Sequence, residues 1–408
     1  MKSTHRKILG ALVAPCFLAT ATLAATDAPA PDTIGDAFAK GKVSLNVRAR
    51  YEGVEQTALK DADAYTIRTR LGYTTAPING FKLMVEAENI SALDSDRYSQ
   101  AGLNPGGAGR AVVADPTGSE INQAWLGYTS GKTMFTAGRQ RLVLDNARFV
   151  GDVGWRQNAQ TFDAVAVTDK SVDKLSLTYG YLYQIDRVFS DRHAQGRWRS
   201  DSHLLNASYS GLPIGTLTGY AYLLDFKNAA APNSCATYGL SLAGTVPASE
   251  VKLAYRAEYA TQSDYGSSAL NYSAEYYVGE LGVVTKPVTV AGGYELLGTD
   301  HNIGFKTPLA TLHAFNGWAD LFLTTPGGGL RDTYGKVATN LPGAIGFLAF
   351  YHDFETDTGI QLGKEWDIQV TRKFGKYFTG LVKYAKFDRD STTVPNAKKL
   401  WCQVEFAY

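Results

Sequence analysis

The sequence of 408 residues has little of several things that common soluble proteins contain. It holds only 3 cysteines and 3 methionines, and 19% of its residues are charged, which is below the usual quarter. Lysine and arginine number 40 against 39 aspartate and glutamate, so the net charge of +1 excludes a simple polybasic nucleic-acid binder. Beyond residue 25 no run of 18 apolar residues occurs, which excludes a transmembrane helix.

Glycine and tyrosine, in contrast, are abundant. The 41 glycines, 24 tyrosines and 12% aromatic residues favour a β-rich chain with many turns. A hydrophobic content of 45% excludes a disordered chain. Cys235 and Cys402 fall on distant predicted strands, so we expect no disulfide between them.

The first residues have the pattern of a secretory signal peptide. Lys2, Arg6 and Lys7 precede an apolar stretch over residues 8–19, and small residues follow up to Ala25. The alternative, an N-terminal membrane anchor, is disfavoured because the apolar stretch is short for a span. We therefore divide the chain into a cleaved signal peptide (1–24), an N-terminal periplasmic segment (25–40) and one further domain (41–408).

Polar and apolar residues alternate strictly in segments of about ten residues. In residues 41–52 one face carries Val43, Leu45, Val47, Ala49 and Tyr51. The same alternation recurs in residues 251–260, 269–280, 362–373 and 399–408. Strands of soluble sandwiches have about five or six residues, whereas about ten are needed for a tilted strand to cross a bilayer. We therefore expect the apolar faces, including Tyr272, Ala274 and Tyr276, to point toward lipid.

Alternation and turn residues predict about 18 strands. Their spans are 41–52, 65–74, 81–90, 120–128, 133–140, 161–168, 174–184, 202–210, 215–226, 235–244, 250–260, 269–280, 287–297, 331–338, 344–354, 363–373, 377–387 and 399–408. Connections after even-numbered strands are short, whereas most of those after odd-numbered strands are longer. This asymmetry indicates an all-β fold, a transmembrane antiparallel β-barrel with short periplasmic turns and long extracellular loops.

Three segments carry a resemblance to a known family. Residues 138–167 read GRQRLVLDNARFVGDVGWRQNAQTFDAVAV, residues 312–336 read LHAFNGWADLFLTTPGGGLRDTYGK, and residues 363–367 read GKEWD. In this order they resemble the alginate-export family of outer-membrane barrels, which implies an 18-stranded exporter of an acidic polysaccharide. The turn 374–376 is too short for the long periplasmic loop that plugs the alginate exporter, so a more open channel is expected.

Charged residues on the polar faces are the candidate pore lining. They are Arg48, Arg50, Arg68, Arg70, Glu86, Glu88, Arg139, Arg148, Arg156, Asp163, Arg256, Glu258, Glu365 and Asp367. Guanidinium groups in a lumen offer stepwise binding sites for carboxylate-bearing sugars. The alternative, in which these charges form structural ion pairs, stays open. The loop 141–160 either folds inward as a constriction or is a surface loop clamped by salt bridges.

The first four of these arginines form the central functional hypothesis. Arg48 and Arg50 share one face of the first strand, and Arg68 and Arg70 share one face of the second. Pairing of the two strands places four guanidinium groups on one patch of wall, with Glu52, Glu86 and Glu88 nearby to neutralise part of the charge. We expect moderate anion preference and binding of uronate oligosaccharides.

The favoured function is passive passage of saccharides, acidic ones foremost, through a channel of the alginate-export type. A general or differently selective small-solute porin is the alternative, and a barrel enzyme acting on lipid or sugar is a third hypothesis. No G-x-S-x-G or H-E-x-x-H motif occurs, so neither an enzyme nor a cofactor or metal site is predicted. The expected location is the outer membrane of a Gram-negative bacterium. The expected partners are membrane lipid, the solute cargo and, through the C-terminal strand, the barrel assembly machinery; no nucleic acid is expected.

Overall fold

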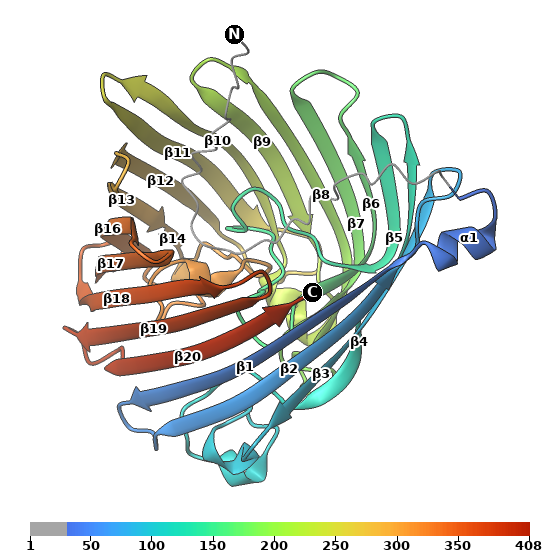
Figure 1. Ribbon diagram of the computed structural model, residues 1–408. Coiled ribbons are helices and arrows are strands. Elements are labelled where there is room, and N and C mark those ends of the chain that lie inside the picture. The colour runs from blue at the N-terminus through green and yellow to red at the C-terminus, as the bar shows by residue number, and fades with distance from the viewer. Residues whose placement is uncertain (1–30) are drawn as a thin grey trace.

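The structure is a computed structural model that describes residues 31–408, so the expected signal peptide lies outside the described residues. Eighteen long strands form one closed antiparallel barrel, in which each strand pairs with its neighbours along the chain and β20 pairs with β1 (Figure 1). They are β1 (Lys42–Gln56), β2 (Ala62–Thr74), β3 (Phe81–Ala92), β4 (Gly118–Ser130), β5 (Thr133–Gln140), β6 (Thr161–Asp169), β7 (Leu175–Asp186), β8 (Arg197–Leu212), β9 (Gly215–Leu224), β10 (Cys235–Ala248), β11 (Val251–Asp264), β12 (Ser273–Val284), β13 (Val288–Leu297), β16 (Leu330–Leu341), β17 (Ile345–Glu355), β18 (Gln361–Phe374), β19 (Phe378–Arg389) and β20 (Ala397–Ala407). The predicted fold is confirmed.

The connections alternate between short turns and long loops, as expected. At the short-turn end, the helix α1 (Ile34–Ala39) packs beside the barrel, where the Phe38 ring stacks on Tyr73 and Ala76 N–H donates to the Ala37 carbonyl. A small hairpin, β14 (Thr299–Asp300) and β15 (Ile303–Gly304), lies within a long loop. Short 3₁₀ helices also occur in the long loops: Ser95–Arg97, Pro105–Gly107, Asn228–Asn233 and, in the same loop as the hairpin, Leu312–Ala314. Within residues 31–408, no helix has the length and hydropathy to cross a membrane.

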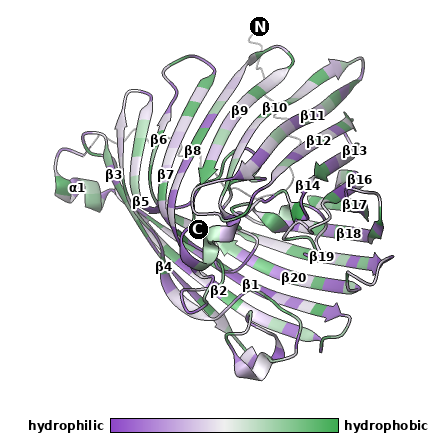
Figure 2. Ribbon diagram, turned by 180° about the vertical axis from the view of Figure 1, so that it is seen from behind, coloured by the Kyte–Doolittle hydropathy of each residue, from purple (hydrophilic) through white to green (hydrophobic). Residues whose placement is uncertain are grey.

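The outer face of the barrel is apolar and the inner face is rich in polar groups. Leu240 and Leu281, which point outward, are 55% and 61% exposed, whereas Arg50 and Glu52, which point inward from β1, are 3% and 0% exposed. Figure 2 shows the resulting alternation of apolar and polar bands along the strands. This distribution of apolar and polar side chains is the reverse of that in a soluble protein, and it is stable where lipid covers the outer face.

Aromatic rings gather near both ends of the outer face. Tyr51 and Tyr65 lie with ring centroids 4.7 Å apart on the long-loop side, and Phe81 and Tyr128 lie 4.6 Å apart near the short turns. Such girdles lie at the two membrane–water interfaces of transmembrane barrels. They support the expected membrane-spanning barrel.

Two long loops fold back into the barrel, where they pack against each other and against the wall. We call residues 141–160 inner loop A and residues 298–329 inner loop B. Val150 of inner loop A forms a β-bridge with Leu309 of inner loop B, and both side chains are fully buried. Phe149 and Phe305 join the same apolar cluster inside the barrel. Figure 1 shows these irregular segments inside the ring of strands. Of the two alternatives for residues 141–160, the structure therefore shows the inward one.

The apolar face of β12 points inward, so the prediction that it faces lipid is wrong. The strand begins at Ser273, four residues later than predicted, and its Ala274 and Tyr276 are buried in the lumen. The Tyr276 ring lies 5.3 Å from Phe149 and 5.5 Å from Phe305. The inner loops bring apolar side chains into the lumen at this height, and this makes an apolar inner face stable.

Candidate functional site

Four arginines from β1 and β2 form one patch of the inner wall. We call this patch, which consists of Arg48, Arg50, Arg68 and Arg70, the arginine wall. Arg48 and Arg68 are direct partners in the register of the two strands, and all four side chains are buried. The alternation of both strands dictates this arrangement, and the predicted grouping is therefore found. Like charges on adjacent strands repel, so each guanidinium needs compensating partners.

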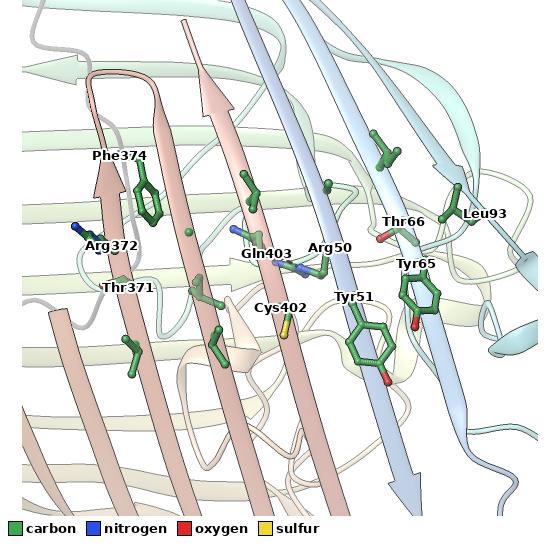
Figure 3. Close-up of a pocket in the computed structure, with 17 residues that line it drawn as sticks. Arg50, Tyr51, Tyr65, Thr66, Leu93, Thr371, Arg372, Phe374, Cys402 and Gln403 are labelled. Carbon is green, nitrogen blue, oxygen red and sulfur yellow. Dashed lines mark hydrogen bonds between the residues drawn. The ribbon is translucent and has the colours of Figure 1, made fainter. Parts of the chain in front are cut away.

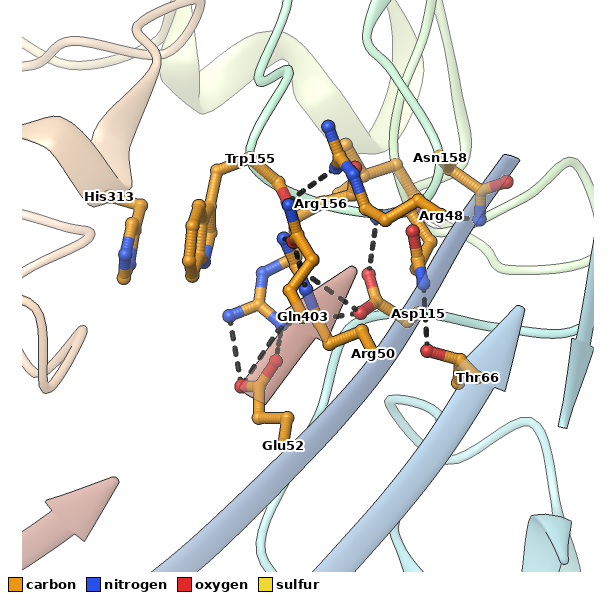
Figure 4. Close-up of polar contacts among 12 residues, drawn as sticks. Arg48, Arg50, Glu52, Thr66, Asp115, Trp155, Arg156, Asn158, His313 and Gln403 are labelled. Atoms are coloured by element: carbon orange, nitrogen blue, oxygen red, sulfur yellow. Dashed lines mark hydrogen bonds and ion pairs between the residues drawn. The ribbon is translucent and has the colours of Figure 1, made fainter. Parts of the chain in front are cut away.

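Arg48 and Arg50 are two of the three arginines of this wall that contact inner loop A. Arg48 Nη1 donates to the carbonyl oxygens of Gly154 and Trp155, each at 3.2 Å. Arg50 donates to Gln403 Oε1 at 2.6 and 3.0 Å, and its guanidinium lies 4.2 Å from the centre of the Trp155 ring. Figure 4 shows Trp155 and Arg156 directly beside β1. The loop is thus bound through its backbone and through a cation–π contact.

Arg68 and Arg48 share a single carboxylate. Both donate to Glu405 on β20 at 3.3 Å, each to a different oxygen. The Nε and Nη1 atoms of Arg68 have no hydrogen-bond partner among residues 31–408. Arg70, in contrast, pairs with Glu88 and donates to the Gln157 carbonyl at 3.1 Å. The Arg48–Arg68 pair therefore carries more positive charge than its one acid compensates.

Arg156 joins inner loop A to both β1 and inner loop B. It donates to Glu52 at 3.0 Å and lies 3.7 Å from Asp115 (Figure 4). It also donates to Asp320 of inner loop B at 3.1 Å. Glu52 is fully buried. One guanidinium thus compensates three carboxylates from different segments, and these would otherwise be costly to bury.

His313 of inner loop B links the two inner loops to β19. It stacks on Trp155 with ring centroids 4.4 Å apart, and its Nε2 lies 2.7 Å from Lys383 Nζ. Because the ammonium group donates, Nε2 accepts, and Nδ1–H donates to Asp320 at 2.7 Å. Burial, together with Lys383 and Arg156, holds the pKa of His313 well below its usual value. The imidazole is therefore neutral.

Asp320 stays ionised in this cluster. Burial by itself would raise its pKa, but His313, Lys399 and Arg156 outweigh that effect and hold the pKa well below the usual range. Lys399 Nζ lies 2.7 Å from its Oδ2. The alternation of β19 and β20 places Lys383 and Lys399 on the inner face, but no signal in the sequence brings His313 and Asp320 to them.

The predicted acids of β18 are anchors for the inner loops. Glu365 on β18 accepts from the Ala319 N–H at 2.6 Å, and Asp367 accepts from the Trp318 N–H at 3.1 Å. Glu295 on β13, which sequence reasoning missed, pairs with Arg148 of inner loop A at 2.9 Å. For these residues the structural ion-pair alternative describes the geometry better than a free pore lining.

Other predicted residues form pairs on the lumen wall with partial exposure to water. Glu86 accepts from Arg141 at 2.9 Å, and both side chains are partly exposed. Arg256 pairs with its neighbour Glu258, which also accepts from Tyr220 Oη at 2.7 Å. In these pairs, and in Arg48 with Glu405, at least one charged side chain is between 11% and 23% exposed.

Arg139 and Asp163 face outward, so the prediction that they line the pore is wrong. Arg139 lies on the same face of β5 as the exposed Phe135, and Asp163 lies on the same face of β6 as the exposed Val165. Arg139 donates twice to Asp163, at 2.8 and 3.0 Å. The sequence pattern of this strand could have predicted the outward direction of Arg139, because the neighbouring Gly138 occupies the inward position.

Comparisons with known proteins agree with this geometry. The family model described as alginate export matches residues 41–192. The structure is similar to OccAB2 of Acinetobacter baumannii, with a TM-score of 0.73 and 15% identity over 92% of this chain and 99% of OccAB2. It is also similar to OpdK of Pseudomonas aeruginosa in its structure with vanillate, with a TM-score of 0.72 and 14% identity over 91% of this chain and 99% of OpdK.

A third similar structure is OccK5 (OpdH) of Pseudomonas aeruginosa, with a TM-score of 0.68 and 14% identity over 91% of this chain and 99% of OccK5. No curated protein matches the sequence significantly. The expected resemblance to the alginate-export family is thus confirmed for residues 41–192, and the chain has the closed 18-stranded antiparallel fold of outer-membrane porins.

Proposed function

We propose that this protein is a passive channel of the outer membrane for small solutes that carry a carboxylate. The observation that carries the proposal is the Arg48–Arg68 pair, in which two guanidinium groups share the single carboxylate of Glu405. A passing carboxylate supplies the missing negative charge and pairs with Arg48, whose side chain is 11% exposed, whereas the side chain of Arg68 is 1% exposed and acts through its charge alone. Because the site is shared with Glu405, binding is weak enough for release, as conduction requires.

Two classes of cargo carry the required group. Acidic saccharides such as uronate oligosaccharides are favoured by the match to the alginate-export family. A small aromatic carboxylate is the second class, because the similar OpdK has been solved with vanillate. In both cases the arginine wall recognises the carboxylate, and the inner loops limit the size of the solute. The proposal involves no catalytic step.

The proposed location follows from the fold and the outer face. An apolar exterior between two aromatic girdles fits the outer membrane, which the chain would reach through the signal peptide 1–24. At the other end, β20 closes the barrel against β1, and Val404 and Phe406 face outward on it. We propose that the assembly machinery recognises this strand. Deletion of residues 406–408 is expected to abolish heat-modifiable barrel in outer membranes, and normal assembly would contradict this role.

The proposed cargo is tested by measuring how added solutes block the ion current through the channel in planar bilayers. For the wild type we expect block by a uronate trisaccharide and by vanillate, but not by a neutral trisaccharide. Arg48→Gln is expected to weaken block by the anions about tenfold, since a charge-assisted hydrogen bond contributes about 1.5–3 kcal/mol. Arg197→Gln removes the same charge from an exposed outward position on β8 and is expected to leave block unchanged. Equal block of wild type and Arg48→Gln would overturn the proposal.

A further inference from the structure

An apolar groove crosses the outer wall of the barrel over β18, β19, β20, β1 and β2. It has a volume of about 570 Å³. In Figure 3 its labelled lining runs from Phe374 and Arg372 on one side to Tyr65 and Leu93 on the other. The groove lies on the face that meets lipid, on the other side of the wall from the arginine wall.

Small side chains along one row of paired residues create the groove. The row is Arg372, Gly380, Val404, Ala49 and Ile67, one residue from each of the five strands. Gly380 has no side chain, and Ala49 has a single methyl group. The rows on both sides carry larger groups, among them Phe374 below and Tyr51 above. The result is a channel on the surface with aromatic walls and a floor close to the backbone.

The length and inclination of the row suit one acyl chain. Four strand spacings of about 4.8 Å separate its ends, so the row is about 19 Å long. The hydrocarbon of one leaflet is about 15 Å thick. Because the strands of such barrels are tilted, the row rises obliquely from Arg372, near the short turn 375–377, toward Tyr65 on the long-loop side. A chain anchored at the periplasmic interface can therefore lie along the whole groove.

A cationic group stands at the periplasmic end. Arg372 is exposed, stacks on Phe374 at 5.1 Å, and has no carboxylate at ion-pair distance within residues 31–408. Lys376 lies in the adjacent turn, whereas Lys373 follows Arg372 on the lumen face of β18. The positive charges of Arg372 and Lys376 attract a phosphate headgroup, and an arginine binds phosphate with two parallel hydrogen bonds.

We propose that this groove binds one anionic phospholipid of the periplasmic leaflet, with its phosphate on Arg372 and one acyl chain over Gly380 and Ala49. The shape of the groove favours an acyl chain, and the charge of Arg372 favours an anionic headgroup. The proposal requires the barrel to span a membrane, but it is independent of which solute the lumen conducts. The test of solute block and the test of lipid binding can therefore contradict one proposal without contradicting the other.

Native mass spectrometry of the full mature barrel in detergent tests this inference. The protein is titrated with dioleoylphosphatidylglycerol and, separately, with dioleoylphosphatidylcholine. We expect one phosphatidylglycerol to bind more tightly than the zwitterionic lipid. Arg372→Gln should remove this preference by weakening phosphatidylglycerol about fivefold, which is the effect of one interfacial charge. Lys132→Gln, at a short turn on the other side of the barrel, is the matched control and should change nothing.

A second variant tests the shape of the groove. Ala49→Leu fills its floor with an apolar side chain on the lipid face, where no folding penalty is expected, and should weaken binding of both lipids. Ala207→Leu makes the same change on the outer face of β8, away from the groove, and should have no effect. Equal binding of the two lipids, or unchanged binding in Arg372→Gln and Ala49→Leu, would overturn the proposal. So would a dimer that forms in place of the lipid complex and is lost in Ala49→Leu.

Discussion

Inner loop A meets two different surfaces inside the barrel. Toward β1 and β2 it meets Glu52 through Arg156, and the arginine wall through the backbone of Gly154 and Trp155. Toward β9 and β12 it meets aromatic rings, where Phe149 lies 5.2 Å from Tyr220 and 5.3 Å from Tyr276.

The two surfaces hold the same loop by different physics. Ring packing depends on area and shape and hardly on salt, whereas the ion pairs depend on every charge being matched. The aromatic side can therefore be a passive support. The arginine wall, with one acid for two cations at Arg48 and Arg68, keeps a charge that a solute can use.

Loss of the central cation should produce the largest effect. Arg156→Leu leaves Glu52, Asp115 and Asp320 buried without their shared partner, at an expected cost of about 3–5 kcal/mol. We expect inner loop A to leave the lumen, which raises single-channel conductance and exposes residues 141–160 to limited proteolysis. Arg197→Leu on the outer face is the control. If Arg156→Leu has the conductance of the wild type and resists proteolysis equally well, the position of the loop does not depend on these charges.

Damage to the aromatic side should cost slightly less and respond differently to salt. Phe149→Ala removes a ring that is nearly buried, at about 3 kcal/mol. The same proteolysis assay should detect the released loop. In Phe149→Ala the loop is held by the remaining ion pairs, so its cleavage is expected to increase with salt, whereas in Arg156→Leu it is held by ring packing and its cleavage should be nearly the same in low and high salt. Identical salt responses would erase the distinction between the two surfaces.

The orientation of β10 can be tested with one substitution at two positions. Leu240→Arg places a charge on the lipid face near the middle of the strand and should cost about 2–3 kcal/mol of unfolding free energy. Ser241→Arg places it in the lumen, opposite Glu258, at a partly exposed position. Its cost should be below about 1 kcal/mol, as for exposed sites in general. Equal urea-unfolding midpoints would contradict this orientation, and the reverse order would mean that inside and outside have been exchanged.

Acid should weaken the contacts of inner loop B by a smaller amount. Because the pKa of His313 is held well below 6.5, the unfolded chain binds a proton below pH 6.5 that the folded protein does not. Stability therefore falls as the pH drops through this range, by at most about 1.4 kcal/mol per pH unit. His313→Gln should flatten the dependence between pH 6.5 and 5, and His203→Gln, on the outer face, should not. An equal slope in all three proteins would contradict this role of His313.

Periodicity was sufficient to predict the barrel. A period of two over about ten residues gave the strands, and on β1, β11, β18 and β20 it also gave the correct inner face. On β12 the same rule placed Tyr276 on the wrong side, because an apolar face fits either lipid or an apolar filling of the lumen. Only the position of the inner loops separates these cases.

The candidate site was predictable only in part. The four arginines could be grouped because two adjacent strands hold them in register. The contacts around these arginines could not be predicted. Arg156 and Glu52 are 104 residues apart in the chain, and Glu405 approaches Arg48 only when the barrel closes. Contacts between loops and wall depend on long-range packing that leaves no periodic signal.

The reversal potential in a salt gradient tests the central claim most directly. The claim is that Arg48 and Arg68 carry uncompensated positive charge along the solute path. In planar bilayers with a KCl gradient, the wild type should show moderate anion preference, and the double variant Arg48→Gln with Arg68→Gln should shift the reversal potential toward cations. Arg197→Gln should match the wild type. A double variant that folds and conducts with the wild-type reversal potential would show that these arginines are structural and would contradict the account.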